Sequence, residues 1–253
     1  MRPENPIGVP FNELSEVDSS NNYAMRQVQA QMAGHGATWF ARYQNAGKGQ
    51  RGKPWDAEPG QNIMMSSVVE PGLLPIENQF LLNMMVALSC YDFFNKYTKS
   101  DTCIKWPNDI YWKDRKAGGI LIENVLKGKE WRFSIVGIGL NINQTLFSAN
   151  LPNPVSLKQI TGMTFNVVDL AKQLCDCLNQ RWRQLQSGEY QKLMDEYISR
   201  LYKLQQIVTL RKQTKVFEAT ITGINDRGEL LTDSPEYSTL AHGSVEWILP
   251  QLK

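Results

Sequence analysis

The chain has 253 residues, 42% of them hydrophobic, which is enough to bury one large core and a small second one. Its 27 Lys and Arg residues nearly balance 25 Asp and Glu residues, and a net charge of +2 argues against a dedicated DNA-binding protein. No apolar run approaches the roughly 18 residues of a membrane span, and the four cysteines lack metal-ligand spacing. We therefore expect a cytoplasmic protein with reduced thiols that binds neither DNA nor a membrane.

The first predicted helix covers residues 20–33 and follows a polar segment. Ser20 is its expected N-cap, Ser19 and Asn21 flank that cap, and residues 34–36 end the helix. Hydroxyls and free N–H groups therefore gather at one point. Such a helix start can hydrogen-bond an amide-like group or an anion, although an ordinary N-cap explains the same residues.

A basic, glycine-rich loop connects two predicted strands, residues 38–43 and 63–69. It reads Gln44-Asn45-Ala46-Gly47-Lys48-Gly49-Gln50-Arg51-Gly52-Lys53-Pro54-Trp55. The glycines let the backbone present N–H groups to an anion, the cations supply charge, and Trp55 offers a flat face for a purine. The spacing is neither that of a Walker loop nor that of a dinucleotide-binding loop. We predict a phosphate loop, with a solvated hairpin tip as the alternative.

A largely apolar helix at residues 77–95 precedes a predicted meander, whose strands cover residues 104–106, 110–112, 119–125 and 131–138. Met84, Met85, Leu88 and Phe94 of this helix are assigned to the core. The meander contains Lys105-Trp106-Pro107-Asn108-Asp109 and Arg115-Lys116-Ala117-Gly118-Gly119. Two lysines at one end of a hairpin, beside a glycine pair that permits close backbone approach, predict a site for a phosphate or carboxylate.

Helices are predicted at residues 167–186 and 190–202, where they cover one face of the sheet. From residue 206 the pattern changes to short β runs, at 208–211, 216–224, 229–232 and 238–240, which predict a small barrel-like domain. The expected boundary near Lys203 gives domains of residues 1–203 and 204–253. The fold class is α+β, with a mixed or antiparallel central sheet and helices packed on it.

Four motifs in this order resemble those of the biotin protein ligase family. Its Gly-Arg-Gly-Arg-x-Gly loop corresponds to residues 47–52, its Lys-Trp-Pro-Asn-Asp turn to 105–109, its Lys-x-Gly-Gly-Ile-Leu-x-Glu strand to 116–123, and its Gly-x-Gly-x-Asn strand end to 137–141. Residues 18–21 resemble its Asp-Ser-Thr-Asn block. The resemblance extends from about Val17 to the C-terminus, and it implies a class II synthetase-like fold with an SH3-like C-terminal domain. Lys48 and Gln50 depart from the family, which usually has arginine at both positions.

The resemblance implies an ATP-dependent ligase. Biotin would be activated as biotinyl-5′-AMP and then joined to a lysine of a biotin carboxyl carrier domain. Lys105 would be the catalytic residue, because it would bridge the biotin carboxylate and the α-phosphate. Biotin would contact Ser19, Ser20, Asn21, Gln44, Lys48, Gly49, Gln50, Lys105, Gly118 and Gly119, whereas ATP, with Mg²⁺, would contact Arg51, Lys53, Trp55, Asn108, Lys116 and Asn141. No residue is assigned as a metal ligand, and no base is assigned for the acceptor lysine.

Three other functions were weighed against this one. A lipoate–protein ligase shares the chemistry, but the polar residues 19–21 favour a ureido group over an apolar dithiolane ring. A bifunctional ligase and repressor would need a DNA-binding domain before Asp18, and about seventeen residues cannot form one. A non-catalytic biotin- or nucleotide-binding module would be expected to lack Lys105 or the loop charges. The sequence does not fix the oligomeric state, for which a homodimer is one option.

Overall fold

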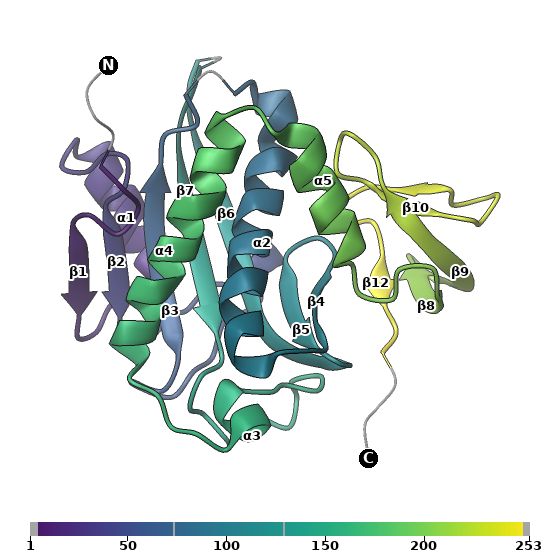
Figure 1. Cartoon of the computed structure of the whole chain (residues 1–253), viewed down its shortest axis with the longest axis horizontal. Coiled ribbons are helices and arrows are strands. Elements are labelled where there is room, and N and C mark those ends of the chain that lie inside the picture. The colour runs from purple at the N-terminus through teal and green to yellow at the C-terminus, as the bar shows by residue number, and fades with distance from the viewer. Residues whose placement is uncertain (1–4, 73, 129, 250–253) are drawn as a thin grey trace.

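The computed structural model describes residues 5–72, 74–128 and 130–249 (Figure 1). Its main sheet has seven strands in the order β1-β2-β3-β7-β6-β5-β4. These are β1 (Phe11–Leu14), β2 (Thr38–Ala41), β3 (Ile63–Val69), β4 (Thr102–Lys105), β5 (Asp109–Trp112), β6 (Arg115–Lys127) and β7 (Glu130–Leu140). Only β1 and β2 pair in parallel, so the sheet is mixed, as predicted.

Helices cover both faces of this sheet (Figure 1). They are α1 (Ser20–Gln29), α2 (Gln79–Thr98), α3 (Leu157–Thr161), α4 (Val167–Gln186) and α5 (Tyr190–Ser199), with short 3-10 turns η1 (Gln50–Gly52) and η2 (Ile76–Asn78). Helices α2, α4 and α5 lie on one face and belong to the main core, whereas α1 packs on the other face against Trp39, Val68 and Ile135. Among the described residues, α1 is the one helix that packs on this face.

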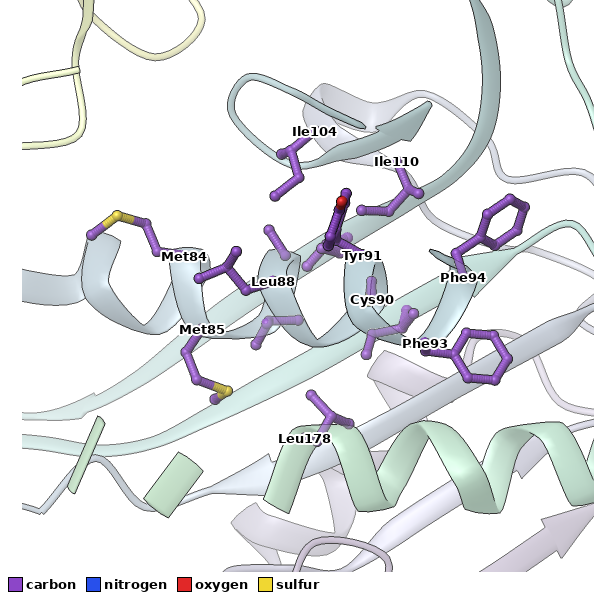
Figure 2. Close-up of a cluster of buried hydrophobic side chains, with 14 of the residues drawn as sticks. Met84, Met85, Leu88, Cys90, Tyr91, Phe93, Phe94, Ile104, Ile110 and Leu178 are labelled. Carbon is purple, nitrogen blue, oxygen red and sulfur yellow. The ribbon is translucent and has the colours of Figure 1, made fainter. Parts of the chain in front are cut away.

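Helix α2 is buried on nearly all sides because it lies between the sheet and α4. Met84, Met85, Leu88 and Phe94 are at most 1% exposed, which confirms their assignment to the core. Figure 2 shows these side chains pointing toward strand residues on one side and toward Leu178 of α4 on the other. Burying each such side chain contributes about 1.5–3 kcal/mol, so this helix anchors the sheet on the side opposite α1.

A second, five-stranded sheet follows α5, in the order β11-β10-β9-β8-β12. It consists of β8 (Ile207–Lys212), β9 (Lys215–Ile224), β10 (Leu230–Thr232), β11 (Thr239–Leu240) and β12 (Glu246–Trp247). The second sheet packs against the part of the chain that forms the main sheet. At this contact the Trp106 indole N–H donates to the Gly228 carbonyl at 2.8 Å. The main hydrophobic core continues into this sheet through Val208 and Leu240. The domain boundary near Lys203 therefore stays a prediction.

Several predicted elements differ from those observed. Helix α1 ends at Gln29 rather than at residue 33, and Ser19, not Ser20, occupies the N-cap position. Gln31 has a left-handed backbone with φ of 58°, which a continuing helix does not allow. Strands β1 and β12 and helix α3 were not predicted. The start of α3 has a capping box formed by Ser156 and Gln159, a signal that the sequence did contain.

Candidate active site

The strand register aligns two predicted site residues, Lys105 and Gly119, with Asp109 and Gly139 in one row across the sheet. Lys105 of β4 pairs with Asp109 of β5, Asp109 with Gly119 of β6, and Gly119 with Gly139 of β7. Directly paired residues point to the same face of a sheet. Ile104 and Ile110, the alternate residues, belong to the core on the other face. The row therefore lies on the sparsely covered α1 face, with a cation and a carboxylate at one end and two bare glycines at the other.

Asp109 brings the two predicted lysines to one place. Lys116 Nζ lies 2.7 Å from Asp109 Oδ1, and Lys105 is the cross-strand neighbour of the same carboxylate. The sequence predicts a turn at Asp109, whereas in the structure this residue begins β5. Because the carboxylate pairs with Lys116, its position fixes where that ammonium group lies.

The Lys105 ammonium is held between aromatic rings rather than in an ion pair. Its Nζ lies 5.5 Å from the ring centroid of Tyr111 and 5.2 Å from that of Trp247. Burial lowers the pKa of Lys105 to about 8; the Asp109 carboxylate opposes this effect, whereas Lys116 and Lys53 add to it. Lys105 is therefore still mostly charged at pH 7, with its N–H donors available to an anion.

Polar side chains gather at the start of α1, and we call this cluster the polar pocket. The Ser66 hydroxyl of β3 lies 2.7 Å from Ser20 Oγ and 2.6 Å from Asn21 Oδ1. The Asn21 amide donates to Glu123 Oε2 at 2.8 Å, and the Ser20 backbone N–H donates to Gln44 Oε1 at 2.7 Å. Ser20, Asn21 and Gln44, predicted from separate parts of the chain, are thus brought together. The pocket contains both donors and acceptors, which here bond to one another.

Two members of this pocket, Ser66 and Glu123, were not among the predicted site residues. Ser66 is fully buried in an otherwise largely apolar strand, and a buried hydroxyl in such a run is the signal that could have identified it. Glu123 ends the third quoted motif, but it was given no role. Ser19 is also buried and caps α1 without a side-chain hydrogen bond.

Glycines create the floor of the site. A Cβ on Gly139 would lie 2.5 Å from the Trp55 ring, and one on Gly119 would lie 3.5 Å from the same ring. The Trp55 indole therefore rests on bare backbone of β6 and β7. Its N–H is buried and has no hydrogen-bond partner among the described residues. Lys116 Nζ lies 6.0 Å from the ring centroid, so the indole borders the cationic end of the site.

Gly118 packs within the sheet rather than on the face that carries Lys105, and its contact with biotin stays a prediction. Gly118 lies on the opposite face of β6 from Gly119, because neighbouring residues of a strand alternate in direction. A Cβ there would lie 2.6 Å from the Gly139 carbonyl oxygen and would overlap the Leu140 side chain. Close packing between β6 and β7 explains this glycine.

The glycine-rich loop is a folded hairpin that reaches two parts of the site. The Trp55 backbone N–H donates to the Gly47 carbonyl at 2.8 Å, and the Gly49 backbone N–H donates to the Lys53 carbonyl at 2.7 Å. Lys48 Nζ lies 4.0 Å from Glu123 Oε1, at the edge of the polar pocket. The loop thus extends from that pocket toward Lys105. The charge of Lys53, at the other end of the loop, lowers the pKa of Lys105.

Gln50 and Arg51 face the second sheet instead. Gln50 Oε1 lies 2.9 Å from His242 Nε2, and the Arg51 guanidinium packs against Gly243. Burial, together with the Arg51 charge, lowers the pKa of His242. Gln50 is a predicted contact of biotin and Arg51 of ATP, and their contacts with the second sheet were not predicted. Both assignments stay predictions, since they require the loop to turn from the second sheet toward the ligands.

Asn108 and Asn141 are both buried, and their amides bind backbone carbonyls. Asn108 donates to the Ile120 carbonyl, and Asn141 donates to the Val155 carbonyl at 3.1 Å. They therefore brace the ends of β5 and β7, and their contact with ATP stays a prediction.

The described ranges contain no group of three or more His, Cys, Asp and Glu residues arranged to hold a metal ion. No helix within those ranges is long and apolar enough to cross a membrane.

Comparison with known proteins places these observations in a family. The model of the biotin/lipoate A/B protein ligase family matches residues 14–141. The bifunctional ligase/repressor BirA of Bacillus spizizenii is 26% identical over 226 residues, which cover 87% of this chain and 69% of that protein. A biotin–[acetyl-CoA-carboxylase] ligase of Paracoccus denitrificans is 27% identical over 231 residues, 88% of this chain and 93% of that protein.

Among solved structures, the biotin protein ligase of Aquifex aeolicus in complex with biotin and ATP is similar. It superimposes with a TM-score of 0.76 at 22% identity and covers 95% of this chain and 96% of that chain. At this identity the likeness shows the fold, including the second sheet. The family match covers half of the chain and includes the α1 pocket, the glycine-rich loop and Lys105. The chain therefore belongs to the biotin/lipoate A/B protein ligase family.

Proposed function

We propose that this protein is an ATP-dependent biotin protein ligase. It would convert biotin and ATP to biotinyl-5′-AMP and pyrophosphate, and then transfer the biotinyl group to a lysine of a biotin carboxyl carrier domain. One observation carries the proposal: Lys105 and Lys116 converge at Asp109, on the sheet face that also holds the polar pocket at α1. The Paracoccus relative, named a biotin–[acetyl-CoA-carboxylase] ligase, supports the same substrate.

The polar pocket suits the biotin head. A ureido ring has two N–H donors and one carbonyl acceptor, and Ser20, Asn21 and Ser66 offer hydroxyl and amide groups of both kinds. These groups now satisfy one another, so binding would exchange hydrogen bonds rather than create unpaired ones. Gln44 holds the Ser20 backbone, and Lys48 would close the pocket from the loop.

The first chemical step joins two anions. A biotin carboxylate oxygen attacks the α-phosphorus of ATP, the bond to the β-phosphate oxygen breaks, and pyrophosphate leaves. Two unit charges 4 Å apart repel by about 4 kcal/mol in a near-surface dielectric. The Lys105 ammonium, placed between them, would cancel this repulsion, and Lys116 would bind a phosphate oxygen. Positioning and charge neutralisation of this kind supply most of the catalysis in such reactions.

The remaining ATP contacts follow the layout of the loop. Arg51 and Lys53 would hold the triphosphate, and adenine would stack on Trp55 beside Asn141. Mg²⁺ would enter with ATP, because this ion is usually held by phosphate oxygens and waters with only one or two protein carboxylates. Asp109 is a carboxylate at the cationic end of the row.

The second step requires a neutral acceptor lysine. Deprotonating a free lysine of pKa near 10.4 at pH 7 costs roughly 4.6 kcal/mol. His35 is a poor candidate base, because its Nδ1 accepts a hydrogen bond from the Glu70 backbone N–H at 3.1 Å. We propose a cytoplasmic location, which the four free cysteines support.

ATP–pyrophosphate exchange with biotin, and separately with lipoate, tests this proposal. A biotin ligase should catalyse exchange with biotin and not with lipoate, because the pocket at α1 is polar. Exchange with lipoate alone would make the protein a lipoate ligase. Exchange with neither acid, together with measurable biotin binding, would favour a non-catalytic binding module.

A further inference from the structure

One wall of the site around Lys105 comes from the second sheet. Trp247 belongs to β12, the short last strand, which lies about 140 residues from Lys105 in the sequence. Its ring centroid lies 5.2 Å from Lys105 Nζ, and Tyr111 covers the same ammonium from β5 at 5.5 Å. The cation is therefore enclosed by two aromatic faces from separate sheets, an arrangement that attracts positive charge.

The structure holds Trp247 firmly in this position. Strand β12 pairs with β8, in a register that sets Trp247 opposite Leu210. The Ile248 N–H donates to the Thr209 carbonyl at 2.9 Å, and the Tyr202 ring lies 5.8 Å from the indole. Backbone pairing on both sides of the residue fixes its place in the sheet, and the Tyr202 ring packs against the indole. Its orientation toward Lys105 is thus set by the fold and not by a mobile side chain.

Two further observations separate this contact from ordinary packing. The Trp247 indole N–H is buried without a hydrogen-bond partner in the described part of the chain, so the ring gains no hydrogen bond from its placement. Asp109, the carboxylate nearest to Lys105 in the register, is engaged by Lys116 at 2.7 Å. The aromatic faces therefore hold the lysine without occupying its N–H donors.

We propose that Trp247 is a positioning residue for adenylation, which holds the Lys105 ammonium where the biotin carboxylate and the α-phosphate meet. This inference rests on the proposed function of the site. It makes the second sheet a part of the active site, because the sheet must be docked for Lys105 to be held. The groups that face Lys105 are Asp109, Lys116, Lys53 and the two rings.

The test compares Trp247→Phe, which keeps a ring, with Trp247→Leu, which keeps only apolar bulk. Tyr237→Ala is the matched control, because Tyr237 also lies in the second part of the chain but its ring packs against that of Phe217, with centroids 4.4 Å apart. Two readouts are measured from pH 6 to pH 10. One is ATP–pyrophosphate exchange with biotin, and the other is the rate of acylation of the Lys105 amine, followed by peptide mass spectrometry. The midpoint of the second curve reports the pKa of Lys105 without requiring activity.

We expect Trp247→Leu to lower exchange at pH 7 by about tenfold or more, because the ammonium is no longer held in place. Water would reach the amine, so the acylation midpoint should rise from about 8 toward the ordinary lysine value. Trp247→Phe and Tyr237→Ala should keep the wild-type midpoint and most of the exchange.

A Trp247→Leu protein with wild-type exchange and a wild-type acylation midpoint would overturn the inference. An equal shift in Tyr237→Ala would also overturn it, since the effect would then be general loosening of the second sheet. If the wild-type protein catalyses no exchange with biotin, the proposed function fails. The acylation midpoints would still decide whether Trp247 encloses Lys105.

Discussion

Gly137→Ala is the substitution that most sharply tests the role of the α1 pocket. Gly137 lies on β7 and pairs with Ser66 on one side and with Leu121 on the other, so it faces the pocket. An added Cβ would lie 2.8 Å from Asn21 Cγ and still closer to its Oδ1. Non-bonded carbon atoms do not approach this closely in proteins, so the Asn21 side chain must move. The backbone of Gly137 is not left-handed, and alanine adds no strain of that kind.

The size of the effect follows from the hydrogen bonds of Asn21. Its side chain interacts with Ser66 at 2.6 Å and with Glu123 at 2.8 Å. Each such bond contributes about 0.5–1.5 kcal/mol, so displacing Asn21 should remove roughly 1–3 kcal/mol of hydrogen-bond free energy from the pocket. If Asn21 binds the ureido ring, biotin affinity should fall by roughly 5- to 150-fold. The KM for ATP should stay near the wild-type value, because Lys116 and Trp55, which are assigned to ATP, contact Asp109 and Gly139 and not Asn21.

Titration calorimetry with biotin, and the KM for biotin in pyrophosphate exchange, measure this effect. Asn21→Ala and the double variant Asn21→Ala/Gly137→Ala complete a double-mutant cycle. The two changes should not be additive, because the side chain that collides with the new Cβ is absent in the Asn21→Ala background. Additive losses, or an unchanged biotin affinity in Gly137→Ala, would refute the placement of biotin against Asn21.

Other predictions concern the cationic end of the site. Lys105→Ala should remove pyrophosphate exchange, by at least about 100-fold, while the protein stays folded by circular dichroism; near-normal exchange would end the role assigned to Lys105. Because the pKa of Lys105 is about 8 and adenylation uses the charged form, kcat/KM for exchange should fall as the pH rises through about 8. That alkaline limb should be absent in Lys105→Arg, whose side chain stays charged, and an unchanged limb would assign it to another group. Asp109→Asn should raise the KM for ATP by about tenfold in initial-rate measurements, because Lys116 loses its 2.7 Å partner; an unchanged KM would show that Lys116 needs no such support.

Where the chain carries strong local signals, sequence reasoning found the elements. Strand β3 and helix α4 have the predicted bounds, 63–69 and 167–186, because β3 is a largely apolar run and α4 has the apolar spacing of an amphipathic helix. Strand β12 was missed because two residues have no periodicity, and Glu246 and Trp247 are extended only through pairing with β8. The fold class was confirmed because the meander and the paired helices leave few other arrangements.

The site was predicted less completely than the fold. Ser20, Asn21 and Gln44 could be named from motifs, and the strand register brings Lys105 to the same face of the sheet. The alternation of side chains along β6 places Gly118 and Gly119 on opposite faces of the sheet, so that only Gly119 shares a face with Lys105. Trp247 could not have been found from sequence, because its contact with Lys105 arises only when the second sheet docks.

A crystal structure with bound biotinyl-5′-AMP, or with a stable analogue of it, tests the central claim most directly. The distance to measure is that from Lys105 Nζ to the oxygens of the bond between biotin and AMP. Our account predicts that the ammonium lies about 2.7–3.2 Å from oxygens of both the biotin carboxyl and the α-phosphate. A Lys105 side chain pointing into bulk solvent, away from that linkage, would contradict it.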